Sequence, residues 1–112
     1  MSKRDANLYV EDIITSMDKI ESYIEGFAFN DFCNDHKTID AVTRNLSIIG
    51  EASNNMPEEI KLMYPEIPWV EIVGMRNKVI HEYFGVDEEI LWKTIKEDLP
   101  NFKEQILKIK TN

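Results

Sequence analysis

Apolar residues recur at intervals of three and four positions along nearly the whole 112-residue chain. On an α-helix this spacing gathers them on one side, whereas a half-buried β-strand needs them at every second position. No segment sustains the strand pattern, and four glycines with four prolines are too few for a turn-rich all-β fold. The sequence therefore predicts an all-α fold, an up-and-down bundle of four to five helices.

The apolar pattern and its interruptions place the long helices. We expect them over residues 5–27, 38–55 and 69–83, with a fourth that begins near residue 88 and keeps its pattern to residue 109. The connections between them are short, which is typical of neighbouring antiparallel helices in a bundle.

Prolines, glycines and acidic residues mark the helix ends. Pro57 should begin a short helix, and Gly85 should end the third long helix as a residue that tolerates a left-handed cap. Asp87 should cap the fourth helix. Pro100 should kink that helix, because it lacks an N–H group and clashes with the preceding turn.

Charge and cysteine content limit the possible functions. The net charge of −8, from 13 Lys and Arg against 21 Asp and Glu, argues against loose binding to nucleic acid but permits a local basic site or a basic protein partner. Cys33 is the only cysteine, and the chain has no 18-residue apolar run. We expect one cytoplasmic domain over residues 1–112, away from membranes, and short enough to bury more surface against a second copy.

Residues 74–87, GMRNKVIHEYFGVD, combine polar and titratable side chains in the third long helix. The apolar stripe of that helix would consist of Val70, Val73, position 77, Ile80 and Phe84. Position 77 is Asn, and a buried amide requires a hydrogen-bond partner. Since His81 lies one helical turn further on, Asn77 is expected to hold its imidazole in one orientation.

Arg76 and His81 could act together on a phosphate. On a regular helix, five residues correspond to about 7.5 Å along the axis and about 140° around it, so both side chains can border one groove. Arginine offers a permanent planar charge and histidine a proton carrier near neutral pH. The pair therefore suits phosphodiester chemistry without a metal or another cofactor, and His36 and His81 lie in no ligand-spaced cluster. A two-fold partner would bring both pairs into one cleft.

A structural role also explains the same residues, and spacing alone favours it. Arg76 could pair with Glu51 or Glu71, His81 could cap the end of the helix, and Tyr83 could pack in the core. An Arg and a His on one helix are common, so spacing leaves both interpretations open.

Four blocks occur in order along the chain: RNLSIIGEA, YPEIPW, GMRNKVIHEYFGVD and LWKTIKEDLP. Together they resemble the HepT-like toxins of the HEPN superfamily, which are partners of minimal nucleotidyltransferase antitoxins. The resemblance covers nearly the whole chain. The motif of these toxins is Arg, four residues, His, one residue and Tyr, which Arg76, His81 and Tyr83 match, with Asn77 as the polar residue after the Arg.

This resemblance implies a dimeric all-α bundle in which two motifs meet at the dimer cleft. It implies a metal-independent endoribonuclease that cleaves RNA with Arg76 and His81 as catalytic residues and Asn77 in support. It also implies that the nucleotidyltransferase antitoxin silences the toxin by adding AMP to Tyr83.

Glu51 and Val70 lie outside the motif but within the blocks that resemble the family. Glu51 is a recurrent family position, where it either forms a structural pair or helps to position Arg76. Many relatives carry a basic residue after PW, where this chain has Val70, so its cleft is expected to be less basic. Two other functions stay open: a non-catalytic nucleotide-binding or docking subunit of a nucleotidyltransferase complex, and a purely structural role of the motif in the dimer.

Overall fold

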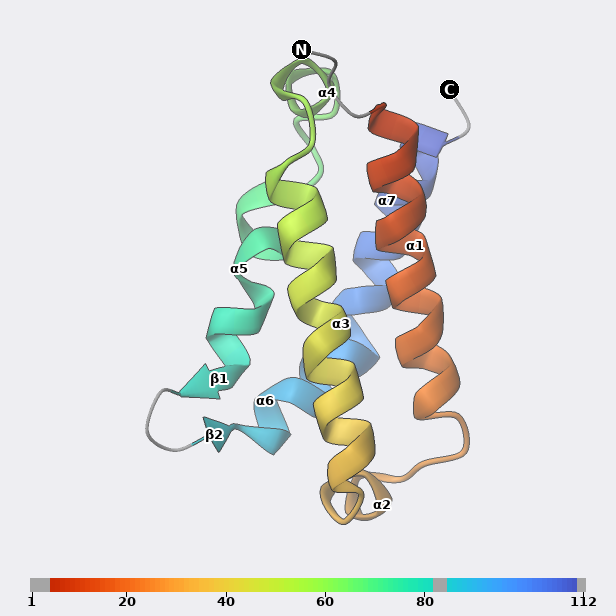
Figure 1. Ribbon diagram of the computed structural model, residues 1–112, viewed down its shortest axis with the longest axis vertical. Helices are drawn as coiled ribbons and strands as arrows, with labels where there is room; N and C mark the ends of the chain where they lie inside the picture. The colour runs from red at the N-terminus through yellow and green to blue at the C-terminus, as the bar shows by residue number, and fades with distance from the viewer. Residues whose placement is uncertain (1–4, 82–84, 111–112) are drawn as a thin grey trace.

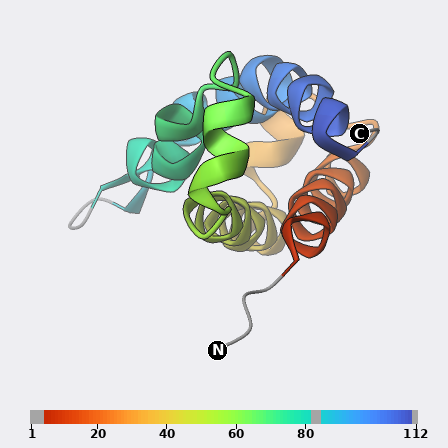
Figure 2. The same cartoon turned by 90° about the horizontal axis from the view of Figure 1, so that it is seen from above.

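Four long helices form the body of the protein in the computed structural model, which describes residues 5–81 and 85–110, with the backbone alone for His81 and Lys110. They are α1 (Ala6–Tyr23), α3 (His36–Asn54), α5 (Trp69–Val79) and α7 (Leu99–Lys110). Helix α3 packs between α1 and α5, and α1 also packs against α7. Seen from above, the four helices surround a common centre (Figure 2). The predicted all-α bundle is confirmed.

Shorter elements close the two ends of this bundle. Helix α2 (Phe29–Cys33) lies at one end and α4 (Glu58–Met63) at the other (Figure 1). Strands β1 (Ile80–His81) and β2 (Gly85–Val86) form a small antiparallel hairpin after α5. Helix α6 (Glu88–Lys93) and the π-helical turn η1 (Thr94–Asp98) then lead into α7. The hairpin is a departure from the purely helical prediction.

The core consists of the apolar stripes predicted for three of the long helices. The buried members from α1 and α3 and from the residues that follow these helices are Val10, Ile13, Met17, Ile20, Ile24, Ile39, Val42, Leu46, Ile49 and Met56. The last stripe contributes Ile95, Leu99, Phe102, Ile106 and Ile109, whereas Trp92 is half-buried. Within the described residues, no helix combines the length and apolar character needed to cross a membrane.

Acidic side chains begin three of the helices. Asp5 accepts a hydrogen bond from the Asn7 N–H at 2.9 Å at the start of α1. Asp35 does the same for α3, and Asp87 accepts from the Ile90 N–H at 3.1 Å at the start of α6. The cap predicted at Asp87 is therefore confirmed, and it ties the end of the hairpin to the next helix.

The interruption expected at Pro100 takes the form of the π turn η1. Pro100 lies in the first turn of α7, immediately after η1. The Leu99 N–H donates to the Thr94 carbonyl, five residues back, as in a π-helix. A widened turn before the proline makes room for a ring that would clash with a regular helical turn.

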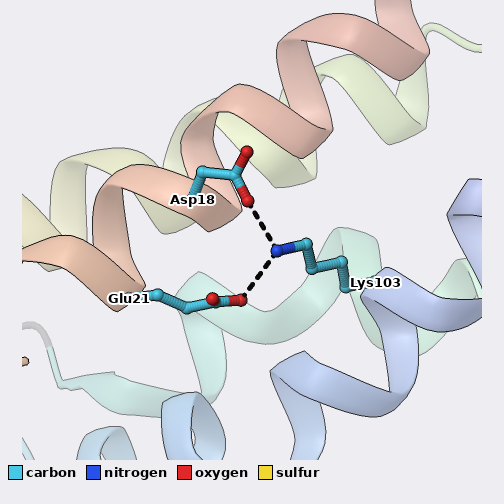
Figure 3. Close-up of polar contacts among 3 residues, drawn as sticks. All are labelled: Asp18, Glu21 and Lys103. Carbon is cyan, nitrogen blue, oxygen red and sulfur yellow. Dashed lines mark hydrogen bonds and ion pairs between the residues drawn. The ribbon is translucent and has the colours of Figure 1, made fainter.

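A three-residue ion cluster joins α1 to α7 on the outside of the core (Figure 3). The Lys103 ammonium lies 2.6 Å from Asp18 and 3.1 Å from Glu21. The hydrogen bond to Asp18, followed by that to Glu21, raises the pKa of Lys103. Because the folded-state pKa is raised, this contribution to stability is complete below the unfolded lysine pKa and is lost as pH rises through the folded one.

Helices α3 and α5 come into close contact at Gly50. A Cβ atom placed on Gly50 would lie 2.9 Å from the backbone carbonyl oxygen of Val73. A backbone group cannot turn aside as a flexible side chain can, so the two helices would have to separate. A glycine at this position therefore sets the distance between α3 and α5.

We expect Gly50→Ala to lower the free energy of unfolding by about 1–3 kcal/mol, because the added methyl group overpacks the α3–α5 contact. Gly74→Ala is the matched control: Gly74 is also helical, but an added Cβ there meets nothing within 4 Å. Its replacement should stabilise the helix by about 0.5–1 kcal/mol. Urea unfolding followed by circular dichroism measures both. Equal effects of the two substitutions would contradict the assigned role of Gly50.

Candidate active site

Helix α5 carries the candidate site, and it faces the core with a different stripe from the one predicted. Its buried residues are Ile72, Met75 and Val79. Val70 is 87% exposed, and Val73 is half-buried. The prediction that the stripe containing position 77 packs in the core is wrong. We call Val70, Val73 and Asn77 the outer stripe.

Asn77 is exposed, so it is not a buried amide in need of a partner. Helix α5 also ends at Val79, four residues before the predicted end, and Ile80 is extended with φ −106° and ψ 125°. The helical relation expected between Asn77 and His81, and between Arg76 and His81, therefore does not apply. The expected capping of the helix end by His81 is likewise not supported, since the backbone of His81 belongs to β1.

The hairpin that holds His81 is attached to the bundle at its base. Ile80 pairs with Val86 and His81 with Gly85, and the Asp87 N–H donates to the Val79 carbonyl at 2.7 Å. The side chains of Ile80 and Val86 pack against the core. From this base the hairpin extends away from the bundle on the α5 side (Figure 2).

Gly85 adopts a left-handed backbone conformation, with φ +76°. The sequence predicted that conformation, but as the cap of a helix, whereas the structure uses it in strand β2. A left-handed residue here lets the chain reverse direction within a very short hairpin. The backbone position of His81 depends on this turn, because His81 is the residue paired with Gly85.

Arg76 lies in the last turn of α5 with an exposed side chain. Its neighbour Lys78 pairs with Asp98 of η1 at 3.7 Å. Within the parts of the chain that the structure describes, Arg76 forms no ion pair with Glu51 or Glu71, so the pairing considered from the sequence is not found. Among the described residues, its guanidinium therefore has no carboxylate partner.

Glu51 lies on the other side of α3 from that expected for a partner of Arg76. It borders a shallow groove of about 130 Å³ between α1 and α3, together with Tyr9, Asp12 and Asn55. Gly50, the preceding residue, is the one that faces α5. A direct effect of Glu51 on Arg76 is not supported, and its role in the site stays a prediction.

Two of the predicted site groups fall outside the description. Tyr83 belongs to residues 82–84, which lie outside the described residues, and so does the side chain of His81. In residues 5–81 and 85–110, no group of three or more His, Cys, Asp or Glu side chains is arranged to hold a metal ion. The described part of the site is therefore Arg76, the outer stripe and the backbone of the hairpin.

The sequence did not predict the apolar groove next to the outer stripe. This groove has a volume of about 440 Å³ and is lined by Asn54, Glu58, Lys61, Leu62, Trp69, Val70 and Val73. Leu62 is 72% exposed and lies beside Val70, which is 87% exposed, and two such apolar side chains together form an exposed apolar patch. The signal in the sequence was a second apolar stripe on α5, which was assigned to the core.

The all-α bundle, with an exposed arginine before a histidine-bearing hairpin, has the architecture expected of a HEPN-like protein. The family model described as Ribonuclease HepT-like matches residues 13–109. The chain therefore belongs to the HepT-like ribonuclease family.

Relatives from archaea agree with this assignment. The chain is 49% identical over 108 residues to a "Probable ribonuclease HepT" of Thermococcus cleftensis, covering 96% of this chain and 98% of that protein. It is 41% identical over 106 residues to a "Putative RNase" of Methanocaldococcus jannaschii, covering 95% and 97%. Another M. jannaschii relative, named as a "Gamma-glutamylcyclotransferase and putative RNase", is 41% identical over 107 residues, covering 96% of this chain and 48% of that protein. No solved structure matches the chain.

We expect Gly85→Ala to reduce ribonuclease activity by distorting the hairpin. A left-handed alanine costs about 1–2 kcal/mol, and the added Cβ meets nothing within 4 Å, so the effect arises from the backbone alone. Gly26→Ala is the control, because Gly26 has φ +80° and equal open space but lies after α1. Both variants should lose similar thermal stability, and only Gly85→Ala should lose RNA cleavage. Equal cleavage by the two variants would show that the hairpin does not contribute to the active site.

Proposed function

We propose that this protein is an endoribonuclease and the toxin of a type II-like toxin–antitoxin pair, with its site completed by a second copy of the chain. Membership of the HepT-like ribonuclease family supports the reaction class. Two relatives that this chain matches over nearly their whole length are named as ribonucleases. The proposed site consists of Arg76 and His81 from each copy, with Asn77 beside them.

The proposed reaction breaks RNA next to its own 2′-hydroxyl group. His81 acts as the base or the acid: a proton leaves the 2′-hydroxyl, the O2′–P bond forms, and the P–O5′ bond breaks as the 5′ oxygen receives a proton. The products are a cyclic phosphate and a free 5′-hydroxyl. Arg76 donates to the phosphate oxygens, where negative charge accumulates in the transition state.

The proposal of a dimer rests on the exposure of the outer stripe. Val70 is 87% exposed, Leu62 is 72% exposed, and the groove beside them is lined in part by Trp69 and Val73. Exposed apolar side chains gathered in this way are typical of a surface that another protein covers. Because the same stripe ends at Asn77, next to Arg76, a two-fold partner seated on it would bring two copies of Arg76 towards one cleft.

Control by a nucleotidyltransferase antitoxin follows from the position of Tyr83 in the motif. Transfer of AMP to its hydroxyl forms a phosphodiester bond and releases pyrophosphate from ATP. The added nucleotide brings negative charge and bulk two residues from His81. That charge competes with the RNA phosphate for Arg76 and so switches the site off.

The alternative function is a subunit that binds a nucleotide or docks a nucleotidyltransferase without cleaving RNA. The net charge of −8 favours it, since an acidic body repels RNA at long range. One experiment distinguishes the two functions, because only the ribonuclease requires His81 for turnover.

Purified protein should cleave RNA in the presence of EDTA, and His81→Ala should lower kcat by at least about 100-fold, the usual contribution of general acid–base catalysis. Arg76→Ala should lower it by a similar factor, through loss of charge stabilisation. Cleavage of a 5′-labelled oligonucleotide measures both. His36→Ala is the matched control, since His36 is exposed at the start of α3. If His81→Ala cleaves as fast as the parent protein, the role of His81 is wrong.

Val70→Asp should convert the dimer to monomers and abolish cleavage, because it places a charge in the centre of the apolar interface. Analytical ultracentrifugation gives the mass, and circular dichroism confirms that the helices remain. Leu8→Asp is the control: Leu8 is 44% exposed on α1, away from α5. A Val70→Asp protein that stays dimeric would show that a different surface forms the dimer.

Co-expression with the cognate nucleotidyltransferase should raise the intact mass of the protein by whole AMP units. Tyr83→Phe should abolish the increase, because it removes the accepting hydroxyl, and Tyr64→Phe should leave it unchanged. Electrospray mass spectrometry measures the increase directly. An unchanged mass in the co-expressed parent protein would remove this form of control.

A further inference from the structure

Asp87 ends the hairpin that carries His81, and its side chain caps α6. We propose that the same carboxylate also orients the imidazole of His81 and stabilises its protonated form. Asp87 is then a positioning residue, which acts on the reaction through His81. This inference rests on the proposed ribonuclease function and adds to it the group that prepares His81 for proton transfer.

The hydrogen-bonded ladder of the hairpin extends one residue beyond its two strands. Ile80 pairs with Val86, and the Asp87 N–H donates to the Val79 carbonyl at 2.7 Å, where the next pair of the same register is expected. Asp87 is itself extended, with φ −82° and ψ 102°. It therefore continues β2 by one residue before α6 begins (Figure 1).

The register puts Asp87 and His81 on the same face of the hairpin. Directly opposite residues of an antiparallel pair share a face, and successive residues of a strand alternate between the two faces. Ile80 and Val86 are opposite each other, and both pack against the core. The next position in each strand, His81 in β1 and Asp87 after β2, therefore belongs to the outer face.

His81 and Asp87 are diagonal neighbours on that face. His81 is paired with Gly85, and Asp87 lies two residues beyond Gly85 on the same side of the hairpin. Diagonal positions of an antiparallel pair are about 7–8 Å apart, within reach of an aromatic side chain. Gly85, directly opposite His81, has no side chain to compete for the space between them.

Capping of α6 leaves the Asp87 carboxylate able to accept further hydrogen bonds. One oxygen, Oδ1, accepts from the Ile90 N–H at 3.1 Å. An ionised carboxylate has about four acceptor positions, so it can cap a helix and bind an imidazole N–H at once. A carboxylate bound to one ring nitrogen fixes the tautomer and the orientation of the ring, and its charge favours the imidazolium.

Other charged and titratable groups surround the hairpin, on the elements packed against it and next to His81 in the sequence. They are Arg76 and Lys78 of α5, Asp98 of η1, Glu88, Glu89 and Lys93 of α6, and Glu82 and Tyr83, which lie outside the described residues. Basic groups disfavour the imidazolium and acidic groups favour it. Lys78 is paired with Asp98, and Glu88 is hydrogen-bonded with Cys33 of α2. A substitution at Asp87 alone keeps all of these groups constant.

The experiment uses Asp87→Asn, which removes the charge and keeps the cap, because Asn and Asp cap helices about equally well. Asp35→Asn is the matched control: Asp35 caps α3 through the Thr38 N–H, also three residues on and also at 3.1 Å. The chain has two histidines, so NMR can follow each imidazole in the whole protein. Asp87→Asn should move the His81 titration midpoint to lower pH by about one pH unit, through loss of the nearby opposite charge. Asp35→Asn should leave that midpoint unchanged.

Kinetics test the effect on the reaction. Asp87→Asn should lower kcat about tenfold at neutral pH, a part of the contribution expected of the acid–base group itself. The limb of the pH profile of kcat that reports His81 should move in the same direction as the NMR midpoint. Asp87→Ser, a second variant that keeps a cap and lacks the charge, should shift both in the same direction. A purely structural role would lower the stability measured by circular dichroism and move neither.

Two results would overturn the inference. One is an unchanged His81 midpoint in both Asp87 variants, and the other is a shifted midpoint with unchanged kcat and pH profile. If the parent protein cleaves RNA in either case, the proposed function stands without a role for Asp87. If the parent protein cleaves no RNA, the proposed function fails and the catalytic role of Asp87 fails with it, while the midpoint still decides whether Asp87 and His81 interact.

Discussion

A close contact between two helix backbones, at Gly50 and Val73, positions α5, the helix that carries the candidate site. Gly50 has no side chain, and a Cβ atom placed on it would lie only 2.9 Å from the Val73 carbonyl oxygen. The entry to α5 adds to this constraint, because the Trp69 indole N–H donates to the Tyr64 carbonyl at 3.1 Å and Ile67 is buried. Together these contacts fix both the distance of α5 from α3 and its rotation. The rotation then decides which side chains face the core and which face outwards beside Arg76.

That rotation explains why the sequence predicts the buried faces of α1, α3 and the last helix well and the buried face of α5 poorly. In α1, α3 and the last helix, one apolar stripe dominates, so the buried face follows from spacing alone. Helix α5 has two stripes at helical spacing: Ile72, Met75 and Val79 face the core, whereas Val70 and Val73 face outwards with Asn77. Local spacing cannot choose between them, because the choice depends on a contact with α3. The Asn at position 77 was the local sign that its stripe is the outer one.

The end of α5 shows a similar limit of sequence-based prediction. The predicted helix reached residue 83, but the chain becomes extended at Ile80, where two β-branched residues, Val79 and Ile80, favour strand over helix. The cap at Asp87 and the left-handed conformation of Gly85 follow from residue type and were predictable. The pairing of Ile80 with Val86 joins residues across the hairpin, so it was not predictable from residue type. For the site, the sequence therefore identified the residues of the motif, while the relation between Asn77 and His81 required the structure.

The distribution of charge resolves the apparent conflict between an acidic protein and an RNA substrate. A net charge of −8 repels RNA from most of the surface, so binding must be local. Where lysines are engaged by Asp98, by Asp18 and Glu21 or by the ring of Trp92, their charge is partly compensated within the fold. Arg76 is not compensated in this way within the described structure, and it lies on α5, one of the two helices that meet at Gly50. If RNA binds at Arg76 as proposed, the acidic surface around that residue restricts where RNA can lie. In the proposed form of control, a nucleotide added to Tyr83 would bring negative charge to the same small area and compete with RNA for Arg76.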